Sequence, residues 1–367
     1  MQKKVGILTL HASHNYGSML QAYALSSFLI KLGYDAQIIN FRSSPQKMMY
    51  AKPYKYWDAQ SIKGRLLSPS FFLKNIGKWN KYEAFMRNEM PLTYEINHVA
   101  DIRRIILENK YDAVITGSDQ IWNINSPDFT IGYLLPFLLP CKKIAYAPSM
   151  GHLQWLQMED VELLFKSTLN DYYALSAREK STADALSDLL HKPINTMPDP
   201  AWLLSQKEYN EISFEKPIVQ HKYMFYYVPQ HEYEGAKIAS QYAHILGLKA
   251  VCSSSPTLPC PGFMNNNNAG PKEFINLLKN ADVVFGYSMH MIVFALLFHK
   301  QFFIISDNPD TRISDLLTSL NLKDRIISAQ NVPNSLILSE IDWSFIDAKI
   351  EEFRSVAKDY LIKSINA

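Results

Sequence analysis

The chain has 367 residues, more than one hydrophobic core usually supports, so two domains of ordinary size are expected. Its composition, 47% hydrophobic and 20% charged with a net charge of +2, is typical of a soluble globular protein. No stretch approaches the roughly 18 uncharged apolar residues that a membrane helix needs. The three cysteines, Cys141, Cys252 and Cys260, lack CxxC spacing, which argues against a disulfide framework and a structural zinc site and fits a reducing cytoplasm.

The first elements alternate between strand and helix. Residues 5–10 form an apolar run typical of a strand, and residues 19–32 repeat apolar side chains at helical spacing until Gly33. A second strand is predicted over residues 36–41. The loop before the helix reads HASHNYG. Its residues Asn15, Tyr16 and Gly17 either contact a ligand or form a turn that Ser18 caps.

A basic and aromatic insertion follows over residues 42–90. Between positions 42 and 87 there are ten Lys or Arg residues against two acidic ones, interleaved with aromatic residues. Such a mixture suits an anionic membrane surface, a phosphorylated lipid head group or a polyanionic glycan. Since no nucleic-acid module is recognisable, no nucleic-acid partner is expected. The alternative is a solvated insertion whose aromatic side chains pack on the domain beneath.

The rest of the chain continues the alternation, which is typical of parallel sheets joined by helical crossovers. We expect an N-terminal domain over residues 1–210, because Pro198 to Pro217 breaks the rhythm, and a C-terminal domain over 211–340. Residues 341–367 should form a closing helix that packs back on the first domain. Further strands are expected at 113–116, 143–147, 173–176, 223–228, 249–252, 282–285 and 302–305, and further helices at 102–107, 181–190, 233–246, 271–280 and after 288.

The pattern therefore predicts two doubly wound, Rossmann-like α/β domains that face a cleft. Ligands of such folds gather at the carboxyl ends of the strands. Polar motifs do follow the predicted strands, which favours an enzyme or a ligand-binding protein. They are HASHNYG, GSDQIWN, APSMG, AREK and SMH.

Two of these loops carry charged candidates. Asp119 is either a general base for an incoming hydroxyl or a residue that fixes its own loop, and its neighbours Ser118 and Gln120 are expected to contact the substrate. Arg178 either forms a plain salt bridge with Glu179 or binds a phosphate or carboxylate through two parallel hydrogen bonds.

His290 follows the strand at 282–285, near the first turn of the next helix, with Ser288 just before it. The backbone N–H groups and the helix dipole attract an anion to this position. An imidazole beside a bound anion can donate a proton near neutral pH. Alternatively, His290 only caps its own helix.

Taken together, the motifs resemble the polysaccharide pyruvyl transferase family almost from end to end. The blocks that carry the resemblance are HASHNYGSMLQAYAL, YDAVITGSDQIWN, KIAYAPSMG, LSAREKSTADAL, DPAWLL, GPKEFINLLKNADVV followed by SMH, and RISDLLTSLNLKDRII. The combination of the first two blocks is highly specific. The resemblance implies a fold similar to that of B-type glycosyltransferases.

The resemblance also implies a reaction. Members of the family transfer the carboxyvinyl-derived group of phosphoenolpyruvate to sugar hydroxyls of a polysaccharide or its lipid-linked precursor, usually as a pyruvate ketal. His290 matches the family histidine and Arg178 the anion-binding arginine. Asp119 could accept the hydroxyl proton. Neither a cofactor nor a metal is expected, and the location would be cytoplasmic, with contact of residues 42–87 to the inner membrane face.

The chain departs from the family pattern beside the histidine. Met291 stands where glycine is usual and Tyr287 where Asn or Asp is usual, so a bulky side chain is expected beside the anion site. Two other functions therefore stay open: a nucleotide-sugar-dependent glycosyltransferase of the same architecture, and a non-catalytic member that binds an anionic glycan or lipid through the insertion.

Overall fold

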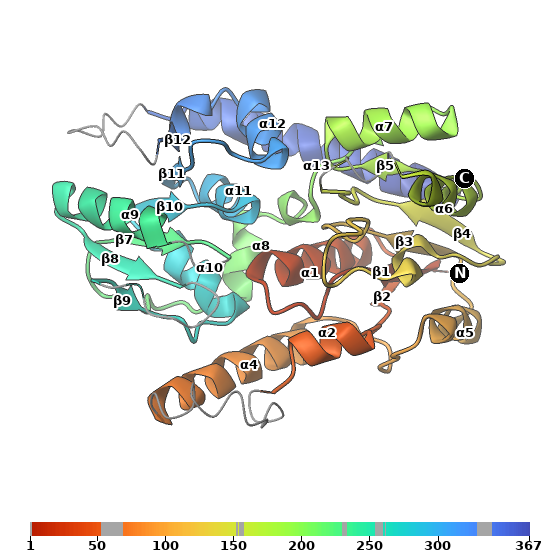
Figure 1. Cartoon of the computed structure of the whole chain (residues 1–367), viewed down its shortest axis with the longest axis horizontal. Helices are drawn as coiled ribbons and strands as arrows, with labels where there is room; N and C mark the ends of the chain where they lie inside the picture. Colours follow the sequence, from red (N-terminus) through yellow and green to blue (C-terminus); the bar gives the residue numbers. More distant parts are fainter. Residues whose placement is uncertain are drawn as a thin grey trace.

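The computed structural model describes residues 2–52, 69–151, 153, 158–229, 233–253, 260, 262–328 and 340–367. They form two lobes, each built around a parallel sheet and covered by helices (Figure 1). Residues 53–68 of the basic insertion lie outside the described residues. The interpretation of that part as a surface for anions stays a prediction.

The first lobe has a four-stranded parallel sheet with the order β2-β1-β3-β4. Its central strands are short runs of buried apolar residues, VGIL and AVIT, as expected for strands covered on both faces. A small two-stranded parallel sheet, β5-β6, lies beside it. The strands are β1 (Lys4–Leu8), β2 (Asp35–Ile38), β3 (Ala113–Thr116), β4 (Lys142–Ala145), β5 (Ser176–Ala177) and β6 (Asn195–Thr196).

The strand predicted at 173–176 was wrong in its bounds. Ala174 makes only an isolated bridge to Ile144 of the main sheet, and β5 begins at Ser176 and pairs with β6. The other helices and strands predicted in this lobe are present, with their ends shifted by a few residues. Its helices are α1 (Tyr16–Lys31), α2 (Ser44–Met49), α4 (Pro69–Glu89), α5 (Val99–Asn109), η2 (Ile131–Leu134), α6 (Glu159–Leu169), α7 (Lys180–Leu190), η4 (Pro200–Trp202) and α8 (Gln206–Glu211).

The second lobe has a six-stranded parallel sheet with the order β12-β11-β10-β7-β8-β9. The helix that follows β10 is apolar on nearly every side, because it packs in the core between the sheet and the neighbouring helices. The elements are β7 (Tyr223–Tyr227), α9 (Tyr233–Ile245), β8 (Lys249–Cys252), β9 (Met264–Asn265), α10 (Pro271–Lys279), β10 (Val283–Gly286), α11 (Met289–Leu297), β11 (Gln301–Ile305), α12 (Thr311–Ser319), η5 (Lys323–Arg325) and β12 (Ile326–Ile327).

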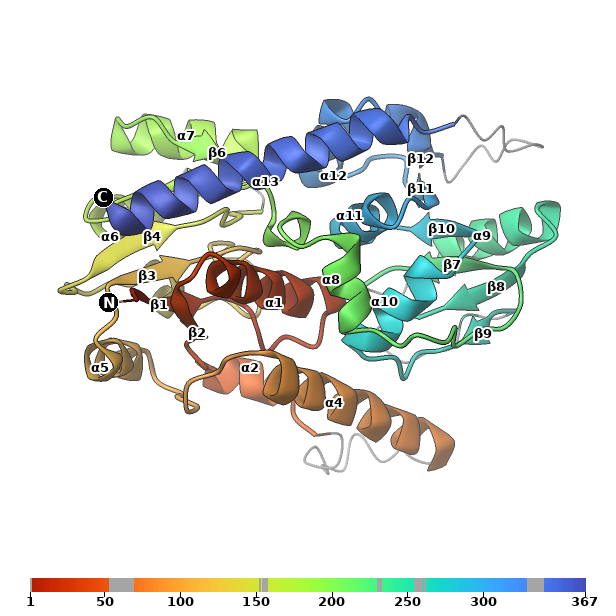
Figure 2. The same ribbon diagram turned by 180° about the vertical axis from the view of Figure 1, so that it is seen from behind.

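The last helix, α13 (Trp343–Asn366), starts near the second lobe and ends against the first (Figure 2). Its Tyr360 hydroxyl donates to the Ala145 carbonyl of β4 at 2.7 Å. Near its end, the Ile365 carbonyl accepts a hydrogen bond from Lys3 at 2.9 Å. The helix thus ties the two lobes together along one side of the molecule.

The described part of the insertion is a helical element rather than a solvated loop. On α4 the aromatic side chains Tyr82 and Phe85 are buried, in agreement with packing on the domain beneath. Charged side chains there pair within the chain: Arg42 Nη2 lies 2.7 Å from Glu83 Oε1, and Lys81 reaches Glu273 of the second lobe at 2.8 Å. Among the helices in the described ranges, none is long and apolar enough to cross a membrane.

Candidate active site

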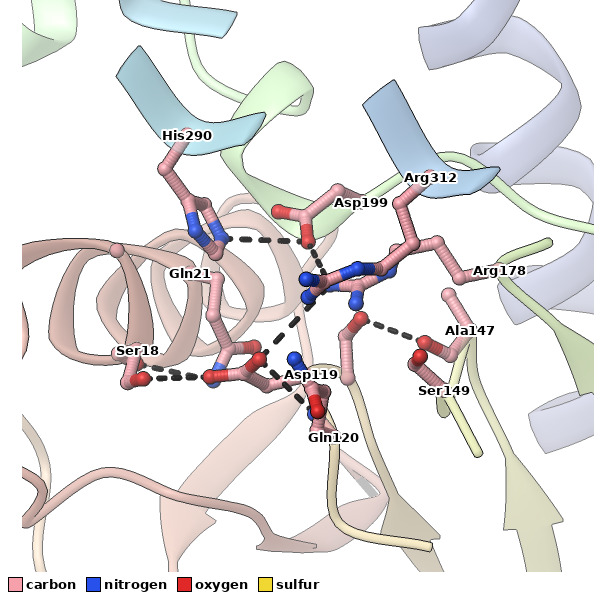
Figure 3. Close-up of polar contacts among 12 residues, drawn as sticks. Ser18, Gln21, Asp119, Gln120, Ala147, Ser149, Arg178, Asp199, His290 and Arg312 are labelled. Carbon is pink, nitrogen blue, oxygen red and sulfur yellow. Dashed lines mark hydrogen bonds and ion pairs between the residues drawn. The ribbon is translucent and has the colours of Figure 1, made fainter. Parts of the chain in front are cut away.

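The polar loops of both lobes converge at the carboxyl ends of their strands, as the sequence predicted. Figure 3 shows side chains that come from the start of α1, the loops after β3, β4 and β5, and the first turns of α11 and α12. These loops are also tied by backbone bonds, since Ser149 N–H donates to the Asp119 carbonyl and Arg178 N–H donates to the Pro148 carbonyl. A rigid frame therefore holds the site.

His290 lies in the first turn of α11, which Ser288 caps by accepting a hydrogen bond from Met291 N–H at 3.4 Å. Its Nε2 lies 3.4 Å from Asp199 Oδ2. On its other side is Gly17, where a Cβ would come within 2.1 Å of His290 Nδ1. The imidazole is thus held between a glycine of one lobe and a carboxylate that follows β6.

Asp199 contacts both His290 and Arg178. Its side chain is almost fully buried and caps η4 by accepting from Ala201 N–H at 2.9 Å. Its Oδ2 lies near His290 and accepts from Arg178 Nη1 at 3.0 Å. Burial favours the neutral acid, but the positive charges and hydrogen bonds of His290 and Arg178 outweigh it and lower the pKa of Asp199 well below its usual range. Asp199 is therefore a carboxylate.

Arg178 is surrounded by carboxylates. Its Nε donates to Glu179 Oε1 at 2.8 Å, its Nη1 donates to Asp199, and Asp119 Oδ1 lies 3.9 Å from Nη1. The side chain is only 5% exposed, and its Nη2 finds no acceptor among the described residues. The resemblance implied that Arg178 binds an anion, but the carboxylate of Asp199 contacts both Arg178 and His290.

Asp119 lies in the loop after β3 with a positive φ of 67°. Its Oδ2 accepts a short hydrogen bond of 2.5 Å from Ser18 Oγ, and its Oδ1 accepts from Gln120 N–H at 2.9 Å. Ser118, predicted to contact substrate, is instead fully buried and donates to the Ala147 carbonyl at 2.6 Å. This loop thus directs Asp119 and Gln120 toward solvent-accessible space and Ser118 into the core.

In the loop before α1, too, one predicted residue lies at the site and its neighbour is buried. Asn15 caps α1 by accepting from Gly17 N–H at 2.9 Å and from Ser18 N–H at 3.3 Å. Tyr16, also predicted to bind substrate, is buried, and its hydroxyl hydrogen-bonds with Ser253 and donates to the Ala269 carbonyl. Tyr16 therefore joins the two lobes and does not line a cavity.

Two cavities meet at this site. The larger, about 710 Å³, has the size of a small-molecule pocket and is lined by His290 and Asp119. The smaller, about 510 Å³, is lined by Arg178 and Asp199. Among the predicted residues, Asn15, Gln120 and Ser288 also line the larger cavity, as does Ser18. Met289 and Arg312 line both cavities.

A family assignment agrees with this arrangement. The family model of polysaccharide pyruvyl transferases matches residues 15–309, which is most of the chain. The chain belongs to the polysaccharide pyruvyl transferase family. No curated protein matches it in sequence.

The fold of this pyruvyl transferase family member is shared with sugar-nucleotide enzymes. A UDP-GlcNAc 2-epimerase from Neisseria meningitidis bound to UDP-GlcNAc has a TM-score of 0.52 and 9% identity, over 100% of this chain and 94% of that chain. The corresponding epimerase from Methanocaldococcus jannaschii has a TM-score of 0.50 and 11% identity, over 96% and 93%. The glycosyltransferase SnogD from Streptomyces nogalater has a TM-score of 0.45 and 11% identity, over 98% and 96%. The similarity concerns the fold alone, and the predicted pair of Rossmann-like domains is confirmed.

The methionine that replaces the usual family glycine does not crowd the site. Met291 is fully buried, and its sulfur lies toward Gly286 at the end of β10, so it lines neither cavity. The expectation that Met291 places a bulky side chain beside the anion site was therefore wrong, because the first turn of α11 directs this side chain into the core. Met289, two residues earlier, is the methionine that reaches both cavities.

Sequence reasoning missed two charged residues of this pyruvyl transferase site. Asp199 belongs to the DPAWLL block but was assigned no role, although an Asp-Pro pair is a common helix-start signal. Arg312 lies in the first turn of α12, where its Nη2 donates to Asp310 Oδ2 at 2.7 Å. Tyr287 holds that turn in place, since its hydroxyl accepts from Asp310 N–H at 2.8 Å. The unusual tyrosine thus supports the start of α12.

Proposed function

We propose that this chain transfers a pyruvyl group from phosphoenolpyruvate to two hydroxyls of a sugar in a polysaccharide or its lipid-linked precursor, and that the product is a ketal. The observation that carries the proposal is the position of His290, which is held between Gly17 and Asp199 at the wall of a cavity also lined by Arg312 and Asp119. A proton donor, a cation and a carboxylate thus face one space of suitable size.

The donor would bind at the second lobe. Phosphoenolpyruvate carries a phosphate and a carboxylate, and Arg312 offers a guanidinium that is partly exposed in both cavities. The N-terminus of α11 adds backbone N–H groups beside Ser288. In this proposal Arg312 takes over the direct anion contact for which Arg178 was predicted, because Nε and Nη1 of Arg178 face carboxylates of the chain. Arg178 then acts by holding Asp199.

His290 would supply the proton that starts the reaction. Asp199 Oδ2 lies 3.4 Å from its Nε2 and holds the ring in position. On its Nδ1 side the ring packs against Gly17, which has no side chain, so the imidazole keeps its place at the cavity wall. Protonation of the methylene carbon of phosphoenolpyruvate turns it into a methyl group and leaves an oxocarbenium-like centre at the neighbouring carbon. A well-placed acid contributes about 10²- to 10⁴-fold to such a step.

Asp119 would accept the proton of the attacking hydroxyl. Ser18 and the Gln120 backbone fix its two oxygens, so the carboxylate is oriented at the cavity wall. The first hydroxyl oxygen bonds to the oxocarbenium carbon, and the second displaces phosphate to close the ketal. Of the two hydroxyl protons, one replaces the proton delivered to the methyl group and the other leaves with phosphate. The atoms balance without a metal or a redox partner.

A binding experiment with two donors tests this proposal. Calorimetric titration of the protein with phosphoenolpyruvate should give saturable binding that Arg312→Ala weakens by about 10-fold or more, because a charge-assisted contact is lost. UDP-GlcNAc, which the Neisseria epimerase holds, is the competing ligand. Saturable binding of UDP-GlcNAc together with no response to phosphoenolpyruvate would favour the glycosyltransferase alternative.

The proposal places the reaction in the cytoplasm, with a lipid-linked acceptor at the inner membrane face. The second alternative, a non-catalytic member that binds an anionic glycan or lipid through the insertion, has weaker support from the described part of the insertion. There Arg42, Lys47 and Lys81 pair with Glu83, Glu95 and Glu273. Charge-reversed Lys47→Glu should therefore leave sedimentation with anionic vesicles unchanged.

A further inference from the structure

One end of the larger cavity is built from hydroxyl groups around a buried carboxylate. Asp128 is 8% exposed and lines the cavity. Its Oδ2 accepts hydrogen bonds from Ser13 Oγ and from the Tyr50 hydroxyl, each at 3.0 Å. Its Oδ1 is buried, and no donor in the described parts of the chain reaches it. A buried carboxylate oxygen without a hydrogen bond is unfavourable, so this atom is poised to accept a hydrogen bond from a ligand.

The insertion holds this wall in place. Tyr50 is the residue at which α2 ends, and its carbonyl accepts a hydrogen bond from Trp79 Nε1 of α4 at 3.0 Å. Its ring also packs on His14, with the ring centroids 5.2 Å apart. Since backbone and ring are both fixed, the Tyr50 hydroxyl and Asp128 are preorganised. The insertion, whose composition suggested contact with an anionic surface, therefore also shapes the interior of the cavity.

The charges in the cavity are separated. Burial, and to a lesser extent the nearby negative charge of Asp119, raises the pKa of the Asp128 carboxyl. The two carboxylates are thus close enough to repel, and this end of the cavity disfavours an anion. The cationic group of the cavity, Arg312, comes from the other lobe. An anionic donor and a neutral partner would occupy different ends.

We propose that Ser13, Tyr50 and Asp128 form the subsite for the acceptor, and that its occupant is a neutral pyranose. A hydroxyl of the sugar donates to Asp128 Oδ1, which brings the neighbouring hydroxyls of the same ring toward Asp119. The inference rests on the proposed function, because it assigns the acceptor of that reaction. It adds that the reacting sugar carries no charge on the ring held here.

The chemistry of the free oxygen selects the occupant. A carboxylate oxygen accepts hydrogen bonds and cannot donate them, so it needs a ligand that carries O–H or N–H groups. Phosphate oxygens at neutral pH are mainly acceptors and negatively charged, and both properties disfavour them beside Asp128. A pyranose offers several O–H donors without charge. Gln120 and Ser126, which line the same wall, can contact its remaining hydroxyls.

Kinetic measurements on two conservative variants test the subsite. Asp128→Asn replaces an acceptor oxygen by a donor group, and Tyr50→Phe removes the hydroxyl that orients Asp128 while it keeps the ring. Each should raise the KM for the acceptor, Asp128→Asn by about 10- to 100-fold, since a hydrogen bond to a charged group is lost. The KM for phosphoenolpyruvate should stay within about twofold. Matched controls are Asp184→Asn and Tyr94→Phe, whose side chains are exposed far from the cavity.

A binding measurement separates failure of the subsite from failure of the proposed function. Saturation-transfer NMR with a panel of neutral methyl pyranosides needs no turnover. Signals with the wild-type protein that Asp128→Asn abolishes, while Asp184→Asn preserves them, support the subsite even if phosphoenolpyruvate is not consumed. Equal signals from wild type and Asp128→Asn, or no signal for any pyranoside with wild type, would overturn it. A native melting temperature of each variant shows that the protein is folded.

Discussion

Gly17 lies against the imidazole of His290, so that a Cβ at position 17 would come within 2.1 Å of Nδ1. The glycine belongs to the first lobe and the histidine to the second, and their contact closes the site between the lobes. Any side chain at position 17 must displace either the ring or the start of α1. The glycine of the NYG motif is therefore explained by this contact, since its own φ is not in the left-handed region.

The first prediction concerns Gly17→Ala. The added methyl should move the imidazole away from Asp199 and reduce kcat by 10²-fold or more, because proton transfer requires positioning within hydrogen-bond reach. Steady-state phosphate release from phosphoenolpyruvate measures the effect.

Gly77→Ala is the matched control, because a Cβ there meets nothing within 4 Å and the residue lies within α4. This substitution should leave kcat unchanged and raise the melting temperature slightly, as alanine favours a helix by up to about 1 kcal/mol over glycine. Full activity of Gly17→Ala would show that the contact with His290 has no catalytic role.

The second prediction concerns Asp199→Asn. The substitution removes the negative charge that faces His290 Nε2 and Arg178 Nη1. The kcat for phosphate release from phosphoenolpyruvate should fall by about 10-fold or more, because the carboxylate that orients both side chains is lost. An unchanged kcat in initial-rate measurements would contradict a positioning role for Asp199.

The third prediction separates the two arginines. Arg312→Lys keeps the positive charge but loses the planar guanidinium and its parallel N–H donors, so it should raise the KM for phosphoenolpyruvate. The melting temperature should change little, since Arg312 is partly exposed. Arg178→Lys should instead lower the melting temperature clearly, because Glu179 and Asp199 lose a buried partner. Differential scanning fluorimetry measures the melting temperature of each variant, and initial-rate kinetics measures its KM. The reverse pattern would restore Arg178 as the direct ligand of the donor.

The fourth prediction concerns Glu83, which anchors α4. Burial raises its pKa, but hydrogen bonds from His14 and Arg42 and the charge of Arg42 outweigh this and lower the pKa to about 2. A lowered pKa in the folded state means that the carboxylate stabilises the protein above pH of about 4.5, and that this contribution is lost as the pH falls toward about 2. Glu83→Gln should therefore reduce the free energy of unfolding by roughly 2 to 4 kcal/mol at neutral pH.

Urea unfolding of wild type and Glu83→Gln across the acid range provides the check. The difference between the two proteins should shrink as the pH falls below 4.5. Lys180→Gln serves as the comparison, because its exposed pair with Asp184 contributes little at any pH. A difference that is independent of pH would show that Glu83 acts through packing rather than charge.

Much of the fold was predictable because buried parallel strands are short apolar runs between turn residues. β3 at Ala113–Thr116 and β8 at Lys249–Cys252 match the predicted strands exactly in their bounds. Helix α4 was not predicted, since its polar residues hide the few aromatic side chains that it buries. The sequence shows that the insertion is basic, but it does not show which acidic residues neutralise it. That Lys81 pairs with Glu273 of the second lobe is seen only in the structure.

The site was predictable where a polar residue directly follows a strand. His290, Asp119 and Arg178 were selected in this way, and the structure brings all three close to Asp199 or to one another. The contacts of these three side chains could not be predicted. For Arg178, the local sequence is the same whether the guanidinium binds substrate or is neutralised by three carboxylates of the chain. Tyr16 and Ser118 look like site residues for the same reason, although their side chains point into the core.

The central claim is that His290 protonates the methylene carbon of phosphoenolpyruvate during transfer to a sugar. The direct measurement is the reaction in D₂O with phosphoenolpyruvate and neutral pyranosides, followed by ³¹P NMR for phosphate and by mass spectrometry for the product. We predict one phosphate per ketal, one deuterium in each new methyl group, and a rate about 10²- to 10⁴-fold lower for His290→Ala. Undiminished transfer by His290→Ala, or a methyl group without solvent deuterium, would contradict the account.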